Sequence, residues 1–161
     1  MSYIGDIRKY VGHAPIMATA AMGIIYDEEK KMILLEQRSD NGMWCVPGGC
    51  LELGESLEEG LFREVKEETN LDIINPQFFD VKANIHMIYP NQDEVYYTDI
   101  VYIITEYSGE LKPDKESTRL EWVKVDELPD NILPTQIDYL IKFVEKLKEE
   151  NFFKSLKNLP R

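Results

Sequence analysis

Three glutamates on one predicted helix are the residues of this sequence whose type and spacing best suit chemistry. Glu64, Glu67 and Glu68 stand at i, i+3 and i+4, so their side chains are neighbours on a helix. Like charges at this spacing destabilise a helix by roughly 0.2–0.5 kcal/mol per pair. A divalent cation would relieve the repulsion, because Mg²⁺ prefers carboxylate, water and phosphate oxygens as ligands. The pattern predicts a metal site, against the ordinary alternative of a solvated acidic helix face.

The surroundings of these acids favour the metal site. Glu68 projects within about 20° of Leu57, near the apolar side of the helix, where an unpaired carboxylate is costly. Gly60 projects between Glu64 and Glu67 and has no side chain, so we expect another backbone or an ion to approach there. A solvated face accounts for neither feature.

The helix itself is predicted over residues 56–69. Ser56 is a suitable N-cap, and Glu59, three residues later, completes a capping box. Its apolar face follows helical periodicity and comprises Leu57, Leu61, Phe62 and Val65. Before the helix, Gly48 and Gly49 form a loop that lets the backbone come close to a ligand. This glycine pair has neither the P-loop nor the dinucleotide-binding pattern.

The remaining elements must position this helix. Apolar runs predict strands at residues 16–26, 32–36, 44–46, 72–88, 95–107 and 120–125, with irregular backbone at 47–49. Further helices are predicted at residues 3–11 and 134–150. The apolar stripe of the last helix is expected to comprise Ile137, Leu140, Ile141, Val144 and Leu147. This order predicts a mixed sheet covered by helices.

Length and composition limit the classes of protein. The chain has 161 residues, of which 43% are hydrophobic, so we expect one folded domain over residues 1–161. Residues 1–15 would be an N-terminal extension and residues 151–161 a tail. The formal net charge of −12 disfavours a nucleic-acid polymer as partner, because such binding neutralises phosphates with basic side chains. The same charge would repel a phosphorylated substrate unless a bound cation reversed the local sign.

The cysteines and the apolar run near the N-terminus bear on location. Cys45 and Cys50 are the two cysteines, and they form no CxxC pair, which is typical of a reducing compartment. The apolar run at residues 16–26 is too short to span a bilayer and is better interpreted as a buried strand. We expect a cytoplasmic protein that does not bind a membrane.

The residues around the glutamates resemble the Nudix box, G-x5-E-x7-R-E-U-x-E-E-x-G-U, where U is aliphatic. Eight of the nine specified positions agree, and Asn70 stands in place of the last glycine. Asparagine is the next-best residue for a left-handed helix terminus, so we expect the turn to be kept. The matching positions are Gly49, Glu55, Arg63, Glu64, Val65, Glu67, Glu68 and Leu71. Residues 44–49 and 122–129 also look like segments of this family.

The resemblance implies an α/β fold, a Nudix-like α/β/α sandwich with a mixed β-sheet between helices. It also implies Mg²⁺-dependent hydrolysis, with Mn²⁺ as a substitute, of the pyrophosphate bond in a nucleoside diphosphate linked to another group. Glu55 would lie behind the metal ligands, and Arg63 would orient the acids through ion pairs. The implied metal ligands are the Gly48 carbonyl, Glu64, Glu67 and Glu68.

Three further residues are candidates with ordinary alternatives. Glu116, in the loop before the strand at residues 120–125, could be a further metal ligand or the general base, or a solvated loop acid. Arg38 could bind a substrate phosphate, or be a surface or structural arginine. Asp99 interrupts an apolar strand and could read a base, or be a solvated residue at a sheet edge.

The box does not identify the leaving group. Nucleoside triphosphates and nucleotide sugars are the expected small-nucleotide substrates, and the alternative to an enzyme is a non-catalytic nucleotide sensor with the same fold. The sensor is disfavoured because all four box glutamates are present. Residues 3–16 and the tail, with Phe152, Phe153 and Leu156, carry enough apolar residues to form a homodimer contact.

Overall fold

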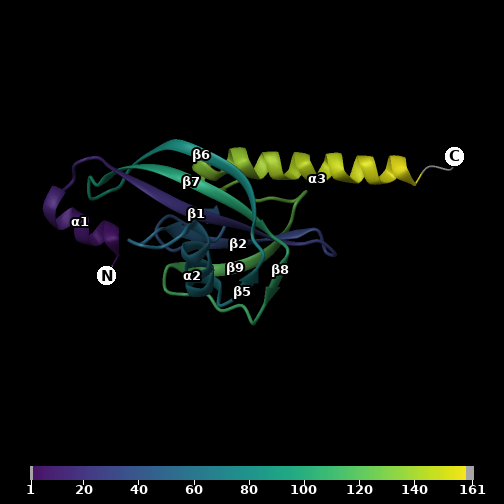
Figure 1. Cartoon of the computed structure of the whole chain (residues 1–161), viewed down its shortest axis with the longest axis horizontal. Coiled ribbons are helices and arrows are strands. Elements are labelled where there is room, and N and C mark those ends of the chain that lie inside the picture. The colour runs from purple at the N-terminus through teal and green to yellow at the C-terminus, as the bar shows by residue number, and fades with distance from the viewer. Residues whose placement is uncertain (1, 159–161) are drawn as a thin grey trace.

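The computed structural model describes residues 2–158, without the side chains of Thr118, Phe152, Phe153 and Leu156. Helices and strands alternate irregularly along the chain (Figure 1). The helices are α1 (Tyr3–Val11), α2 (Leu57–Thr69) and α3 (Ile137–Lys157), which a 3₁₀ turn at Pro134–Gln136 precedes. The strands are β1 (Ile16–Asp27), β2 (Met32–Arg38), β3 (Trp44–Cys45), β4 (Gly48–Cys50), β5 (Asp72–Ile74), β6 (Gln77–Ile88), β7 (Glu94–Ile104), β8 (Glu106–Ser108) and β9 (Ser117–Lys124).

The main sheet is mixed, as expected for an α/β fold. Its strand order is β3-β2-β1-β7-β6, while β4 pairs with β1 and β9 pairs with β2. The pairing of β1 with β7 is parallel, and the other pairings in this sheet are antiparallel. Strands β5 and β8 form a separate pair. The long parallel pairing makes β1 the central strand of the sheet.

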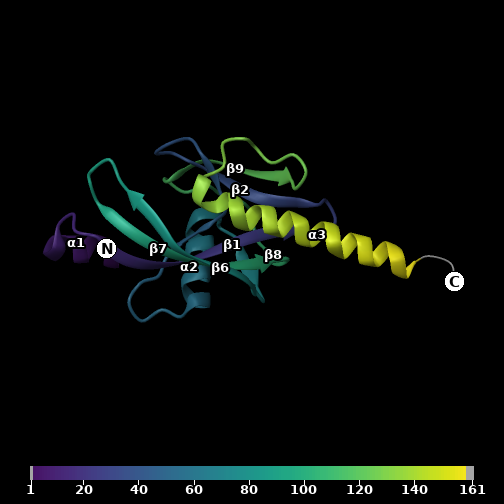
Figure 2. The same cartoon turned by 90° about the horizontal axis from the view of Figure 1, so that it is seen from above.

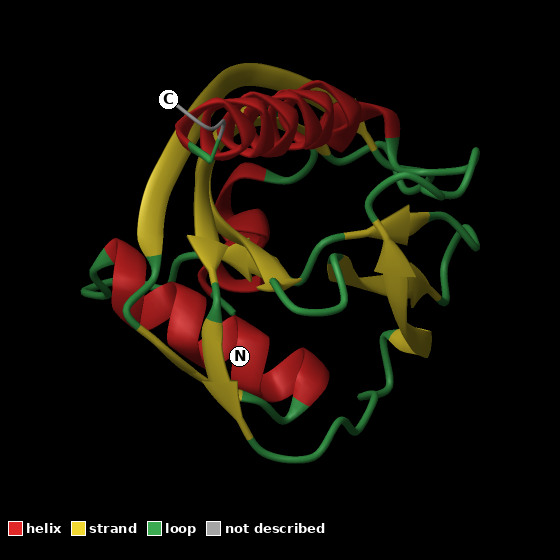
Figure 3. Ribbon diagram, turned by 90° about the vertical axis from the view of Figure 1, so that its right-hand side faces the viewer, coloured by secondary structure: helices red, strands yellow, loops and turns green. Residues whose placement is uncertain are grey.

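Alternate residues of β1 point to opposite faces of the sheet, and each face is covered by a different helix. Ala21 and Ile25 pack with Leu61 and Val65 of α2. The residues on the opposite face, Ala20, Met22, Ile24 and Tyr26, pack in the core that includes Leu140 of α3. Figures 1 and 3 show α3 and α2 on opposite sides of the strands. This is the expected α/β/α sandwich.

The buried face of α3 differs from the predicted stripe. Ile137 and Ile141 are 37% and 51% exposed, whereas Tyr139, Leu140 and Phe143 are almost completely buried. The aromatic rings bury more apolar area than isoleucine does, and the ring of Phe143 makes edge-to-face contacts with other rings. Its partners in those contacts are Tyr26 and Phe79. The second half of α3 extends beyond the sheet (Figure 2).

Other expectations about the elements also need correction. Regular backbone is not lost throughout residues 47–49, because Gly48–Cys50 pairs with β1 as β4. The predicted strand at residues 72–88 is two strands, β5 and β6, because Asn75 has a φ of 49° and precedes a proline. Phe62 of α2 is 40% exposed and lies outside the buried face. The predicted strand at residues 95–107 also divides in two, into β7 of the main sheet and β8, which pairs with β5. The last helix continues to Lys157, seven residues beyond its predicted end.

Within residues 2–158 we find no helix whose length and apolar character would let it cross a membrane.

The end of α2 has the left-handed turn that the substitution of glycine by asparagine allows. Asn70 has φ 64° and ψ 7°, and its backbone N–H donates to the carbonyl of Lys66. Its side-chain Nδ2 donates to the carbonyl of Glu110, at 2.8 Å. The expectation that Asn70 keeps the turn is confirmed, and the side chain adds a contact that glycine could not make.

We expect Asn70→Ala to lower the free energy of unfolding by about 1–2 kcal/mol, because alanine is strained at positive φ. Asn70→Gly keeps the backbone conformation and should cost less than Asn70→Ala. Urea unfolding followed by circular dichroism measures both changes. Equal stabilities for the two variants would contradict this account of the turn.

Candidate functional site

Two glycines allow β4 to lie close to both β1 and α2. A Cβ on Gly48, whose φ is 143°, would lie 2.3 Å from the backbone oxygen of Ala21. A Cβ on Gly49 would lie 2.6 Å from the carboxyl carbon of Glu64. No side chain fits at either position without displacing its neighbours. The glycine pair is therefore required by close packing of the loop against the acidic helix.

Arg63 is the hydrogen-bonding centre of the site. Its Nε and Nη2 donate to the two carboxylate oxygens of Glu55, at 2.6 and 2.9 Å. Its Nη1 donates to Glu64 at 2.6 Å and lies 3.6 Å from a carboxylate oxygen of Glu67. A further bond reaches the backbone carbonyl of Cys50. The guanidinium thus connects the loop after β4 to the acids of α2, which is the orienting position that the resemblance implied.

The hydrogen bonds from Arg63 stabilise the ionised form of Glu55. They lower the pKa of its carboxyl to about 2, and the N–H of Glu52, which donates to the same carboxylate at 2.8 Å, acts in the same direction. Glu55 is therefore a permanent negative charge near neutral pH. It holds Arg63 in place through two hydrogen bonds.

Burial makes the carboxylates of Glu68 and Glu64 more basic. Glu68 is 9% exposed, and its Oε2 accepts a hydrogen bond from the N–H of Gly48 at 2.7 Å. Burial, followed by the negative charge of Glu36, raises the pKa of Glu68 well above its usual value. Burial also raises the pKa of Glu64. The predicted closeness of Glu68 to the apolar side is confirmed, and a nearby positive charge would stabilise both carboxylates.

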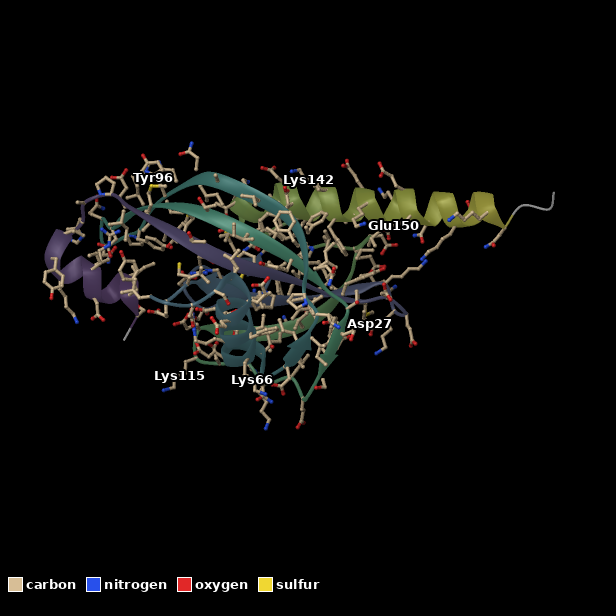
Figure 4. The ribbon with its side chains drawn as sticks, in the orientation of Figure 1. Asp27, Lys66, Tyr96, Lys115, Lys142 and Glu150 are labelled. Atoms are coloured by element: carbon tan, nitrogen blue, oxygen red, sulfur yellow. The ribbon has the colours of Figure 1, made fainter. Side chains whose placement is uncertain are left out.

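An acidic pocket of about 420 Å³ lies beside this helix. It brings together five of the residues that the sequence singled out: Arg63, Glu64, Glu67, Glu68 and Glu116. The sequence analysis missed its other lining residues: Ser2, Glu52 and Asp114. With six acidic residues and one basic residue in this lining, the pocket is strongly negative. Figure 4 shows Lys66 and Lys115, from α2 and from the loop before β9, pointing outward from the molecule.

The donor set of the acidic pocket fits a hard divalent cation. Carboxylate oxygens are the ligands that Mg²⁺ prefers, and an excess of negative charge near a buried carboxylate favours its binding. Among the side chains that the structure describes, no three aspartate, glutamate, histidine or cysteine groups are already gathered around one point. The carboxylate of Glu64 instead pairs with Arg63. Metal binding would therefore require Glu64 and its neighbours to turn toward the ion.

Three predicted site residues are not among those lining the acidic pocket: Arg38, Gly48 and Glu55, the last of which pairs with Arg63. Arg38 donates through Nε and Nη2 to both carboxylate oxygens of Asp40, at 2.9 and 2.7 Å. Its proposed contact with a phosphate stays a prediction. Gly48 uses its backbone N–H to hold Glu68, and the role of its carbonyl as a metal ligand stays a prediction as well.

Asp114 could have been found by its closeness to Glu116 in the sequence. Its Oδ1 accepts hydrogen bonds from the backbone N–H groups of Glu116 and Ser117 and from the hydroxyl of Ser117. These bonds fix the loop that carries Glu116 toward the pocket. Asp114 therefore shapes the pocket, while Glu116, which is exposed, keeps a free approach to solvent.

Glu36 has no clear signal in the sequence, because it stands at the polar end of β2, before Gln37 and Arg38. Its side chain is 6% exposed, and burial raises the pKa of its carboxyl to about 7. One carboxylate oxygen accepts a hydrogen bond from the thiol of Cys45, at 3.3 Å. Its charge acts on Glu68 and couples β2 electrostatically to the site.

Two expectations about packing near the site are wrong. The space beside Gly60 is filled by side chains, because a Cβ there would lie 2.2 Å from Cδ2 of Leu51 and 3.2 Å from a carboxylate oxygen of Glu55. Asp99 is not at a sheet edge, because β7 lies between β1 and β6. It is 7% exposed, and burial raises the pKa of its carboxyl to about 6.

Comparison with known proteins gives consistent matches. A family model described as the NUDIX domain matches residues 17–144. An ADP-ribose pyrophosphatase from Methanocaldococcus jannaschii is 31% identical over 127 residues, which are 77% of this chain and 71% of that protein. A NAD-capped RNA hydrolase from Vibrio atlanticus is 31% identical over 128 residues, or 78% of this chain, but the match spans only 44% of that protein.

A solved structure of similar shape is the crystal structure of a MutT protein from Bacillus halodurans. It superposes with a TM-score of 0.65 at 28% identity, and the match covers 78% of this chain and 80% of that one. Residues 17–144, which the family model matches, include the glycine loop, α2 and the loop of Glu116 but not α1.

We expect Arg63→Lys to lower the free energy of unfolding by about 1–3 kcal/mol, because a lysine cannot reproduce the fork of bonds to Glu55 and Glu64. Lys66→Ala is the matched control on the same helix: its ion pair with Asp72 is exposed, so its loss should cost less than about 1 kcal/mol. Thermal and urea unfolding measure both effects. A larger loss in the control than in Arg63→Lys would rule out Arg63 as the centre of the site.

Proposed function

This chain belongs to the Nudix family and is a pyrophosphohydrolase, and we propose that it uses Mg²⁺ or Mn²⁺ to cleave the pyrophosphate bond of a small nucleotide. The observation that carries this proposal is the acidic pocket, in which acids from α2 and from the loop before β9 lie around a single arginine. Such a donor set would hold a divalent cation and would otherwise repel any phosphate. The full set of box glutamates gives no support to the alternative of a non-catalytic sensor.

When bound, the cation supplies charge neutralisation for the diphosphate and lowers the pKa of a coordinated water. Glu64, Glu67 and Glu68 are the side chains proposed to hold it, with the Gly48 carbonyl as a further oxygen ligand. Arg63 keeps Glu64 near the glycine loop in the free protein. The N–H of Gly48 keeps the carboxylate of Glu68 directed at the site from the buried side.

Glu116 is proposed to accept the proton of the attacking water. It lines the same pocket as the helix glutamates but comes from a different element. It can therefore accept a proton while the glutamates of α2 hold the ion. It is exposed, as a base that returns its proton to solvent must be. The competing role for Glu116 is that of a further metal ligand.

Small nucleotides are the proposed substrates, with nucleoside triphosphates and nucleotide sugars as the classes to test first. The similar proteins act, by their names, on ADP-ribose and on NAD-capped RNA. The net charge of −12 favours the small nucleotide over the RNA, because a polymer would bring many further phosphates to an acidic protein. A contact of Arg38 with a substrate phosphate and a homodimer stay secondary predictions. The two free cysteines support a cytoplasmic location.

Glu67→Gln and Glu64→Gln should each reduce kcat by about 100-fold or more, since each removes a proposed ligand charge while keeping the shape of the side chain. Glu58→Gln makes the same change on the same helix outside the acidic pocket and should retain kcat within about threefold. Phosphate or pyrophosphate release with excess Mg²⁺ is the measurement. If Glu67→Gln and Glu64→Gln turn over like Glu58→Gln, these acids do not hold the catalytic ion.

Removal of divalent cations with EDTA should abolish hydrolysis, and Mg²⁺ or Mn²⁺ should restore it. The substrate panel comprises nucleoside triphosphates, nucleotide sugars, ADP-ribose, dinucleoside polyphosphates and NAD-capped RNA, with products identified by mass spectrometry. We expect cleavage within the pyrophosphate of a small member of the panel. Turnover that persists in EDTA would refute the metal dependence, and a strong preference for the capped RNA would refute the substrate class.

A further inference from the structure

Helix α1 lies outside the region matched by the family model, yet its N-terminal end reaches the acidic pocket. The backbone N–H of Tyr3 donates to Oε2 of Glu52 at 2.7 Å. Glu52 lines the acidic pocket, and a carboxylate at the first turn of a helix is favoured by the helix dipole. In Figures 1 and 2, α1 lies at the end of the molecule where β1 begins and where β6 and β7 connect.

Arg8 fixes α1 against that connection between β6 and β7. Its guanidinium donates to the backbone carbonyls of Gly12, Ala14 and Glu94, at 3.0, 2.6 and 2.7 Å. Its Nε also lies 3.6 Å from a carboxylate oxygen of Asp93. Backbone carbonyls and the carboxylate of Asp93 thus surround the guanidinium of Arg8. The helix is therefore held as a fixed wall.

A cavity of about 500 Å³ separates α1 from the β6–β7 connection, and we name it the α1 cavity. It shares Ser2, Glu52 and Glu64 with the acidic pocket, so the two spaces are continuous. Its other walls are mostly apolar or aromatic, with Ile4, Cys50, Tyr89, Pro90, Val95 and Tyr97, and they also include Arg8, Asn91 and Asp93. A volume of this size accommodates a nucleoside, since small-molecule pockets span roughly 300–1,000 Å³.

The chemistry of the α1 cavity suits an uncharged aromatic group. The hydroxyl oxygens of Tyr89 and Tyr97 lie 2.7 Å apart and hydrogen-bond to each other, which leaves their rings as the contact surface. Burial raises the pKa of Tyr97, so this hydroxyl stays neutral and its hydrogen bond with Tyr89 is kept. A flat base packs well on such rings and on proline.

We propose that the α1 cavity binds the nucleoside of the substrate, with the base against Tyr89 and Tyr97 and the diphosphate in the acidic pocket. The N-terminal extension therefore forms one wall of the substrate site, and residues such as Ile4 determine which nucleosides fit. This inference rests on the proposed function for its assignment of the diphosphate, but the binding of a nucleoside alone needs no metal and no hydrolysis.

The test is nucleoside binding in EDTA, with adenosine, guanosine, cytidine and uridine as probes and saturation-transfer NMR as the measurement. At least one probe should bind the unmodified chain, and Ile4→Trp, which fills the cavity, should weaken that binding tenfold or more. Tyr10→Trp is the matched control on the same helix, because Tyr10 is 86% exposed and does not line the cavity. It should bind the probe with unchanged affinity.

A second variant guards against a folding defect in Ile4→Trp. Tyr89→Ala removes a ring from the opposite wall and should weaken the same probe tenfold or more, with the thermal midpoint of each variant measured in parallel. With a hydrolysed nucleotide, both variants should raise KM tenfold or more and change kcat by less than threefold.

The outcomes separate this inference from the proposed function. Nucleoside binding that is lost in both variants, in a chain that hydrolyses no nucleotide, would support the α1 cavity and reject the hydrolysis. Hydrolysis with a KM that neither variant changes would reject the α1 cavity and keep the hydrolysis. Failure of every probe to bind the unmodified chain would also reject it.

Discussion

Negative charge concentrated between α2 and β4 is the physical condition on which the arrangement of this site depends. Glu64 and Glu68 are largely withdrawn from water, and burial raises the pKa of both carboxyls. Arg63 and the N–H of Gly48 offset part of the cost by donating to them. One guanidinium cannot balance the acids that line the acidic pocket, so the folded chain keeps an excess of negative charge there. Conditions of this kind are typical of functional sites, where local stability is given up for chemistry.

The conformation of the backbone around the site is related to that excess of negative charge. The acids of α2 can receive hydrogen bonds from the loop only if β4 approaches closely, and the absence of a Cβ at Gly48 and Gly49 permits the approach. Pairing of β4 with β1 then anchors the loop in the main sheet. A sheet strand is more rigid than a free loop, so the positions of the Gly48 N–H and carbonyl are determined before any ligand arrives. The same pairing explains why these residues are regular rather than a turn.

What the sequence could predict depends on whether the determining contacts are local. The capping box at Ser56 involves residues three apart, and it is present as predicted, with both of its hydrogen bonds. The exposed Phe62 and Ile141 were assigned to the core because periodicity defines a helix face only to within a neighbouring stripe. Which stripe is buried depends on the partner sheet, and on α3 the larger ring of Phe143 occupies that place. The burial of Asp99 follows from strand order, which no local pattern encodes.

The division of work between elements also explains why the box predicts chemistry better than substrate. Its glutamates lie on one short helix, so their spacing alone specifies a cation-binding surface. The walls of the α1 cavity come instead from α1, the β6–β7 connection and β7, and only the fold brings Ile4 beside Tyr89 and Tyr97. Helix α1 lies outside the region matched by the family model, whereas the acids of α2 lie within it. We infer that the reaction belongs to the shared helix and the choice of nucleoside to the added one, which is how one fold supports several substrates.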